Sequence, residues 1–151
     1  MTTILNIVDA LTKLLEDNKN SLQYQHLFLG MQDLIPGTPT IIITFDKKQK
    51  AISGAPQFRA EYTFRFTIFA CRVTQDESNY RDAIEIGEAV ELLLDSNSHL
   101  RQSDGSTLIT FGMVTLSEQG IAVKESSRTI YRTVTLTYDC EVYSIMPNPT
   151  N

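Results

Sequence analysis

The stretch RTIYRTVTLTYDCEVYSI, from Arg128 to Ile145, decides how the rest of this chain must be arranged. It contains no glycine and no proline, and β-branched and aromatic residues dominate it, which is typical of a β-strand. At about 3.3 Å per residue this strand would span about 60 Å, whereas an ordinary strand has about 5–6 residues. Apolar residues alternate with threonines, so one face of the predicted strand is polar.

Two helices are predicted on either side of a second β-rich region, and each carries an apolar stripe at helical spacing. The first runs from Thr3 to Asp17, and its stripe is made of Ile4, Ile7, Val8, Leu11, Leu14 and Leu15. The second runs from Asn79 to Leu94, and its stripe is made of Tyr80, Ala83, Ile84, Gly87, Val90, Leu93 and Leu94. Both stripes are expected to pack against a sheet.

Three further segments have the composition or the alternation of strands, namely Thr40–Asp46, Phe58–Thr74 and Thr107–Leu116. A turn is predicted at Asp104-Gly105, and residues 117–127 are predicted to connect to the last strand. Residues 26–30, HLFLG, are compatible with a short strand or with an irregular packed segment. The order of elements predicts one α+β domain, residues 1–151, with a mostly antiparallel sheet of long strands packed against two helices.

The polar stretch KKQKAISGAPQ, residues 47–57, is predicted as a projecting loop. It is longer than the usual connection between paired strands, which has about 2–5 residues, and such loops often carry function. Lys47, Lys48, Lys50 and Gln57 are therefore candidate docking residues, with a hairpin arm or a plain surface loop as the alternatives. Residues 146–151 are expected to form a frayed tail.

Two cysteines, Cys71 and Cys140, lie inside strand-like runs. Alternation places Cys140 on the apolar face of the last strand and Cys71 opposite the apolar set of its own strand. In one sheet the two sulfurs would lie on opposite sides and could not form a disulfide bond, unless a bulge reverses one of them. Two free thiols fit a reducing cytoplasm.

The chain has 151 residues, a hydrophobic fraction of 42% and a net charge of −5. These values suit one domain with an ordinary core, and the acidic balance argues against a protein that grips nucleic acid. No run of 18 apolar residues exists to cross a membrane, and the N-terminus, MTTILNIVDALTKLLEDNKN, lacks the pattern of a secretory signal.

No catalytic, cofactor-binding or metal-ligating residues are predicted. His26 and His99 stand alone, without a second ligand at the spacing that a metal site requires. Ser98 adjoins His99, but neighbours in sequence rarely face each other, and no third group supports a nucleophile. Arg59 and Arg65 share a strand face with acidic and threonine side chains, so cross-strand ion pairing is the simpler account than binding of nucleic acid.

Four features of the chain are together similar to the tail terminator and neck proteins of long-tailed bacteriophages. They are the amphipathic helix TILNIVDALTKLL, the aromatic strand EYTFRFTIFACRV, the helix YRDAIEIGEAVELLL and a late arginine entering the last β-run, SSRTIYRTVTLTYDCEVY. The resemblance covers the chain from Thr3 to Tyr143, although residues 22–37 match nothing in that family.

The resemblance implies a non-enzymatic virion protein, assembled in the host cytoplasm and needing no cofactor. Such proteins form a ring, commonly a hexamer, that closes the tail tube and joins it to the head connector. The implied partners are further copies of the chain, the tail tube protein and connector or adaptor proteins, while DNA passes through without specific binding. The last strand is then expected to reach into a neighbouring subunit. Asp139 and Glu141 are candidates to line the channel, with bulk solvent as the alternative.

Three rival functions stay open at this point. A head-completion or portal-adaptor protein of the neck would share these features. A small cytoplasmic enzyme or ligand-binding module would need a pocket with convergent polar groups. An obligate homodimer with an extended shared sheet is the third.

Overall fold

The computed structural model describes residues 2–54, 57–73, 77–101, 108–124 and 129–145. The predicted turn at Asp104-Gly105 and the predicted tail at residues 146–151 lie outside these ranges. The elements in chain order are α1 (Ile4–Asp17), α2 (Lys19–Leu22), β1 (His26–Leu29), β2 (Thr40–Gly54), β3 (Gln57–Arg72), α3 (Glu77–Asp95), β4 (Phe111–Lys124) and β5 (Thr129–Ile145).

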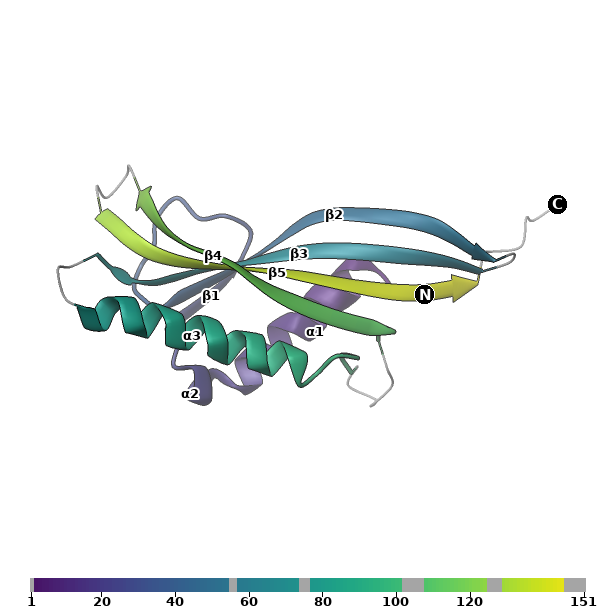
Figure 1. Cartoon of the computed structure of the whole chain (residues 1–151), viewed down its shortest axis with the longest axis horizontal. Helices are drawn as coiled ribbons and strands as arrows, with labels where there is room; N and C mark the ends of the chain where they lie inside the picture. Colours follow the sequence, from purple (N-terminus) through teal and green to yellow (C-terminus); the bar gives the residue numbers. More distant parts are fainter. Residues whose placement is uncertain (1, 55–56, 74–76, 102–107, 125–128, 146–151) are drawn as a thin grey trace.

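The strands form one long, twisted sheet, in the order β1-β2-β3-β5-β4 within the described residues. Every neighbouring pair is antiparallel except β1 and β2, which are parallel. Helices α1 and α3 lie along one face of this sheet (Figure 1) and share a single apolar core with it. The predicted α+β class is confirmed, with the four-residue helix α2 as an addition.

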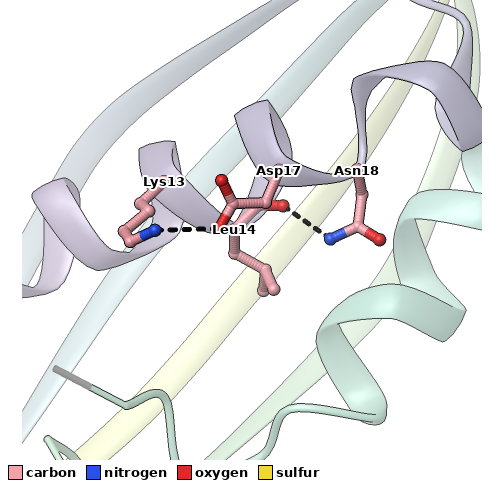
Figure 2. Close-up of polar contacts among 4 residues, drawn as sticks. All are labelled: Lys13, Leu14, Asp17 and Asn18. Atoms are coloured by element: carbon pink, nitrogen blue, oxygen red, sulfur yellow. Dashed lines mark hydrogen bonds and ion pairs between the residues drawn. The ribbon is translucent and has the colours of Figure 1, made fainter. Parts of the chain in front are cut away.

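Helix α1 begins and ends at side-chain caps. The Thr3 hydroxyl accepts a hydrogen bond from the Asn6 backbone N–H at 3.2 Å, and the Asn6 side chain accepts one from the Thr3 backbone N–H at 3.0 Å. Figure 2 shows the other end, where the Asn18 amide donates to the Leu14 carbonyl at 2.9 Å. These caps hold the helix in place over the sheet, with its apolar stripe turned to the core.

The core between the helices and the sheet is built by the even-numbered residues of β3 and β5, as alternation predicts. Phe66 and Tyr138 are completely buried at its centre, where their rings meet edge to face at 6.2 Å and 89°. Burying a side chain of this size stabilises the fold by about 1.5–3 kcal/mol. The aromatic residues of the two long strands therefore hold the helices and the sheet together.

Strand β5 lies inside the sheet, so the expectation that it reaches into a neighbouring subunit is wrong. It pairs with β3 from Tyr131 to Ile145 and with β4 from Thr129 to Glu141. Its length is matched by the length of β3 and β4, which satisfy its backbone hydrogen-bonding groups within the same chain. The free edges of the sheet belong to other strands.

Of the two alternatives for residues 47–57, the hairpin arm is correct and the plain surface loop is wrong, because β2 continues as a strand to Gly54. Its residues from Lys47 to Gly54 pair with β3, from Thr63 to Gln57, after a bulge at Asp46. The long strand β3 offers a continuous partner, and a polar strand at an edge can leave its side chains in water. Similarly, β4 runs on to Lys124, where residues 117–127 were predicted to form a connection.

The two cysteines lie on the same face of the sheet, contrary to the prediction. A bulge at Ala70 shifts the register between Phe69 and Cys71, and this turns Cys71 toward the helices, where it packs against the main core. Cys71 lies opposite Arg132, whereas Cys140 lies opposite Tyr62, nine residues away along β3. At about 3.3 Å per residue the two levels are about 30 Å apart. Neither cysteine forms a disulfide bond.

One end of the sheet is covered on both faces. The HLFLG segment forms β1, and residues 30–39 then cross the face opposite the helices. There Ile35 packs with Ile42, Phe69 and Tyr131 in a second buried cluster. Strand β1 pairs with β2 only as far as Ile43, so the outer edge of β2 has no strand beside it in the described chain beyond that point.

Candidate assembly surface

The sheet face that points away from α1 and α3 is called here the open face. Alternation and register assign to it Thr44, Lys47 and Gln49 of β2, Arg59, Glu61, Thr63, Arg65 and Thr67 of β3, Thr135, Thr137, Asp139, Glu141 and Tyr143 of β5, and Phe111, Met113 and Thr115 of β4. The two predicted candidates, Asp139 and Glu141, are thus neighbours on one surface.

A groove of about 370 Å³ crosses this face. Its centre is lined by three carboxylates, from Glu61, Asp139 and Glu141. Lys47 and Gln49 of β2 line one side of the groove, and Phe111 and Met113 of β4 line the other. We call this feature the carboxylate groove. Its lining residues come from four strands, and no single stretch of the sequence indicates that they lie close together.

The arginines of the open face are held in ion pairs, as the sequence predicts. Arg59 lies between Glu61, at 3.2 Å, and Glu141, at 3.9 Å. Arg65 lies 3.2 Å from Asp46 of the neighbouring strand. Such exposed pairs contribute about 0–1 kcal/mol each to stability, so they order the side chains more than they stabilise the fold.

Asp139 has a different environment from the other two carboxylates of the groove. The Thr63 hydroxyl donates a hydrogen bond to its Oδ1 atom at 2.7 Å. No ion pair joins Asp139 to any described residue, and its side chain is exposed. The groove therefore carries a carboxylate that is available to a cation from outside the chain.

The candidate docking lysines do not act as one basic cluster. Lys47 lies on the open face, whereas Lys48 and Lys50 lie on the opposite face. There the Lys48 ammonium lies 5.1 Å from the centre of the Tyr62 ring, and the Lys50 ammonium lies 5.5 Å from the centre of the Phe58 ring. Gln57 is the first residue of β3, opposite Gly54 and Ile145. Alternation along the strand separates the lysines.

The two outer edges of the sheet differ in character. The edge of β2 beyond Ile43 carries a bulge and several lysines, which are features that discourage one strand edge from pairing with its like. The beginning of β4 instead exposes apolar side chains, with Phe111 48% and Met113 52% accessible. Sequence alternation places these two residues on one face, but only the strand order shows that they border an edge and a groove.

Beneath the groove, on the helix side, lie two groups that stay neutral. Burial, with a smaller contribution from the Asp139 carboxylate, raises the pKa of the Cys140 thiol to about 12. Burial also raises the pKa of the Tyr138 phenol above its ordinary value of 10.0. The Tyr138 hydroxyl is buried without a hydrogen-bond partner. Neither group has the environment of an activated nucleophile.

These pKa values predict a loss of stability in alkaline solution. Between pH 9 and 12 the unfolded chain releases the Cys140 proton while the folded chain keeps it, so the unfolded state binds fewer protons and stability falls as pH rises. Urea unfolding across this range should show a shallower decline for Cys140→Ala than for the unchanged protein. Equal slopes in the two proteins would contradict the assignment.

The two histidines make contacts within the fold. The His26 ring stacks on Phe28 at 5.9 Å, and His99 Nδ1 lies 2.9 Å from the Thr110 carbonyl oxygen. Among the residues the structure describes, no group of three His, Cys, Asp or Glu side chains could hold a metal ion. No helix in the described part of the chain combines the length and apolar character that crossing a membrane requires.

Comparisons with known proteins show a likeness in structure but none in sequence. No model of a known protein family matches the chain, and no curated protein matches it. Among solved structures, the fold is similar to that of a chain in the structure described as "Virion of native gene transfer agent (GTA) particle". The two share 12% sequence identity and a TM-score of 0.51, over 88% of this chain and 92% of that one. The likeness therefore shows a common fold across almost the whole of both chains.

Proposed function

We propose that this chain is a structural protein of a phage-like virion. The observation that carries the proposal is the shared fold with a chain of a gene transfer agent virion, which extends over nearly all of both molecules. Within that class, the resemblance of the two helices and two long strands to tail terminator and neck proteins supports a narrower role. The chain would form a ring, commonly six-fold in that family, that closes the tail tube and joins it to the head connector.

The sheet geometry supports assembly through strand edges. Strand β4 and the part of β2 beyond Ile43 present free backbone edges at opposite sides of one sheet, in the described part of the chain. Two different edges of one molecule can meet head to tail, and such contacts generate a ring when the rotation closes. Closure removes both edges, which would otherwise promote uncontrolled association.

The open face is suited to line the channel of that ring. Its threonines are short and polar, and Arg59 and Arg65 are engaged with carboxylates of their own sheet. Asp139 and Glu141 then add negative charge to the wall. A wall of this kind offers few free cations to phosphate groups, so DNA would pass without being held.

The end of the β2–β3 hairpin is the proposed contact with the tail tube or the connector. Figure 1 shows this end extending past α1 and α3, so it is free of the helices. Lys48 and Lys50 lie near it on the helix side of the sheet, and Gln57 begins its second strand. The predicted docking residues thus belong to a paired arm instead of a loop.

Particles that lack this protein test the proposal. Electron micrographs should show tails of uncontrolled length, or tails detached from filled heads, and supplying the protein should restore complete particles. Normal particles in its absence would overturn the proposed function. The symmetry of the ring in complete particles separates two roles, because six copies favour a tail terminator and twelve favour a neck adaptor.

A further inference from the structure

We propose that the free edge of β2 in one copy, at Thr44–Gln49, pairs with the beginning of β4, at Phe111–Thr115, in the next copy. The partner is a second copy of this chain, and the pairing is antiparallel. Lys47 of each copy then reaches the carboxylate groove of its neighbour. This inference rests on the proposed ring and identifies the surfaces that would close it.

Strand direction favours this pairing. Strands β2 and β5 run in one direction, and β3 and β4 run in the other, because each neighbouring pair from β2 to β4 is antiparallel. Copies placed side by side in the same orientation therefore bring β4 against an oppositely directed β2. Antiparallel pairing is the slightly more stable arrangement per residue, and it keeps all copies pointing the same way around the ring.

The levels of the two edges along the sheet also match. Through the registers of β3 and β5, Thr44 lies level with Thr115, and Gln49 lies level with Phe111. Strand β1 stops at Leu29, opposite Ile43, so β2 becomes free at Thr44, which is level with Thr115 of β4. The pairing is therefore limited to Thr44–Gln49 and Phe111–Thr115, and β4 must turn away from the neighbour's β1 at its bulge between Leu116 and Glu118.

Charge complementarity identifies the occupant of the groove. Lys47 lies two strands away from Asp139 within its own sheet, because Thr63 separates them. A neighbour's Lys47 beside Met113 would lie two strands away on the other side, at about 10 Å between backbones. Asp139 forms no ion pair with the chain's own Lys47 or with any other described residue, so a second lysine at this distance would meet an unpaired carboxylate. The neighbour's lysine thus supplies the missing cation.

The same contact covers exposed apolar surface and discourages a competing one. The methylene groups of the neighbour's Lys47 would lie along Met113 and shield it from water, while the ammonium reaches the groove. Pairing of two β2 edges with each other would instead bring lysines of both copies together, which is unfavourable. Strand β2 therefore prefers β4 as its partner.

Cross-linking between two variants that each carry one added cysteine tests the interface. Gln49→Cys and Met113→Cys are prepared separately, mixed during ring assembly and treated with a short bismaleimide. A covalent dimer is expected in the mixture and not in either variant alone. The unchanged protein measures the background, which should be low because Cys140 is buried and Cys71 is half-buried. A dimer formed by Met113→Cys alone indicates a two-fold β4–β4 contact and overturns the proposal.

A charge exchange tests the role of Lys47. Lys47→Glu and Asp139→Lys should each reduce ring formation about tenfold, because like charges then meet across every interface. An equal mixture of the two variants should recover ring formation, because alternating copies place opposite charges at each contact. If the mixture stays as defective as either variant, the assignment of the groove is wrong.

The two proposals fail in different ways. Rings that form without the mixed cross-link would overturn the β2–β4 interface and leave the virion role intact. A mixed cross-link together with normal particles in the absence of the protein would overturn the virion role and leave the interface intact.

Discussion

Replacing Phe66 with alanine is expected to lower the free energy of unfolding by about 3–5 kcal/mol. Phe66 is completely buried on the helix side of β3, where its neighbours across the sheet are Ile43 and Leu136. Its ring also meets the Tyr138 ring edge to face. Alanine would remove all of these contacts and leave a cavity between the sheet and the helices. Urea unfolding followed by circular dichroism measures the loss.

Phe111→Ala is the matched control, because the same atoms are removed from a site on the other face. Phe111 is exposed on the open face, and its replacement should cost about 1 kcal/mol or less. A domain of this kind has a total stability of about 5–15 kcal/mol, so only the first substitution threatens folding. Similar losses for both would show that the core lies elsewhere.

Gly112→Ala is expected to destabilise the protein by about 1–3 kcal/mol, although it adds only one methyl group. A Cβ atom at this position of β4 would overlap the Tyr138 hydroxyl and press on Ile109. Because the Tyr138 ring is fully buried, it cannot swing aside as an exposed side chain would. Thermal and urea unfolding should both show the loss.

A double-mutant cycle with Tyr138→Phe identifies the cause. Tyr138→Phe alone should be close to neutral, because the hydroxyl that it removes is buried without a hydrogen-bond partner. In that background Gly112→Ala should cost less, since the nearest clashing atom is gone. If the stability losses of Gly112→Ala and Tyr138→Phe are strictly additive, the Tyr138 hydroxyl is not the cause of the loss at Gly112.

The elements that alternation or helical spacing marks clearly were predicted well. Helices α1 and α3 and strands β3 and β5 lie within a few residues of their predicted limits, because each shows a long regular apolar pattern. These features depend on local periodicity, which the chain carries in the order of its residues.

The predictions failed where the pattern is polar. Residues 47–54 and 117–124 were expected to be loops, yet they extend β2 and β4. A polar segment becomes a strand when a long neighbour offers backbone groups to pair with, and that neighbour lies elsewhere in the chain. Cys71 was placed on the wrong face for a related reason, since the bulge at Ala70 has no glycine or proline to signal it.

The candidate site was predicted in part. Asp139 and Glu141 are two residues apart in one strand, and this spacing was sufficient to place them side by side on one face. The other side chains of the carboxylate groove come from three further strands, and the sequence does not order those strands. The lysines of the predicted docking loop were grouped by proximity in sequence, which alternation along a strand then divides between two faces.

The sequence by itself determined which segments are amphipathic, which face of each strand is apolar, and that the chain builds an α+β domain around two long strands. Only the tertiary structure decided that β5 is an interior strand, that β4 and the part of β2 beyond Ile43 are edges, and that Lys47 and Met113 border the same carboxylates. The physical reason is that side-chain periodicity is a local property of the chain. Strand order, register and bulges depend on hydrogen bonds between residues far apart in sequence, so the surfaces available for assembly become visible only when the sheet is complete.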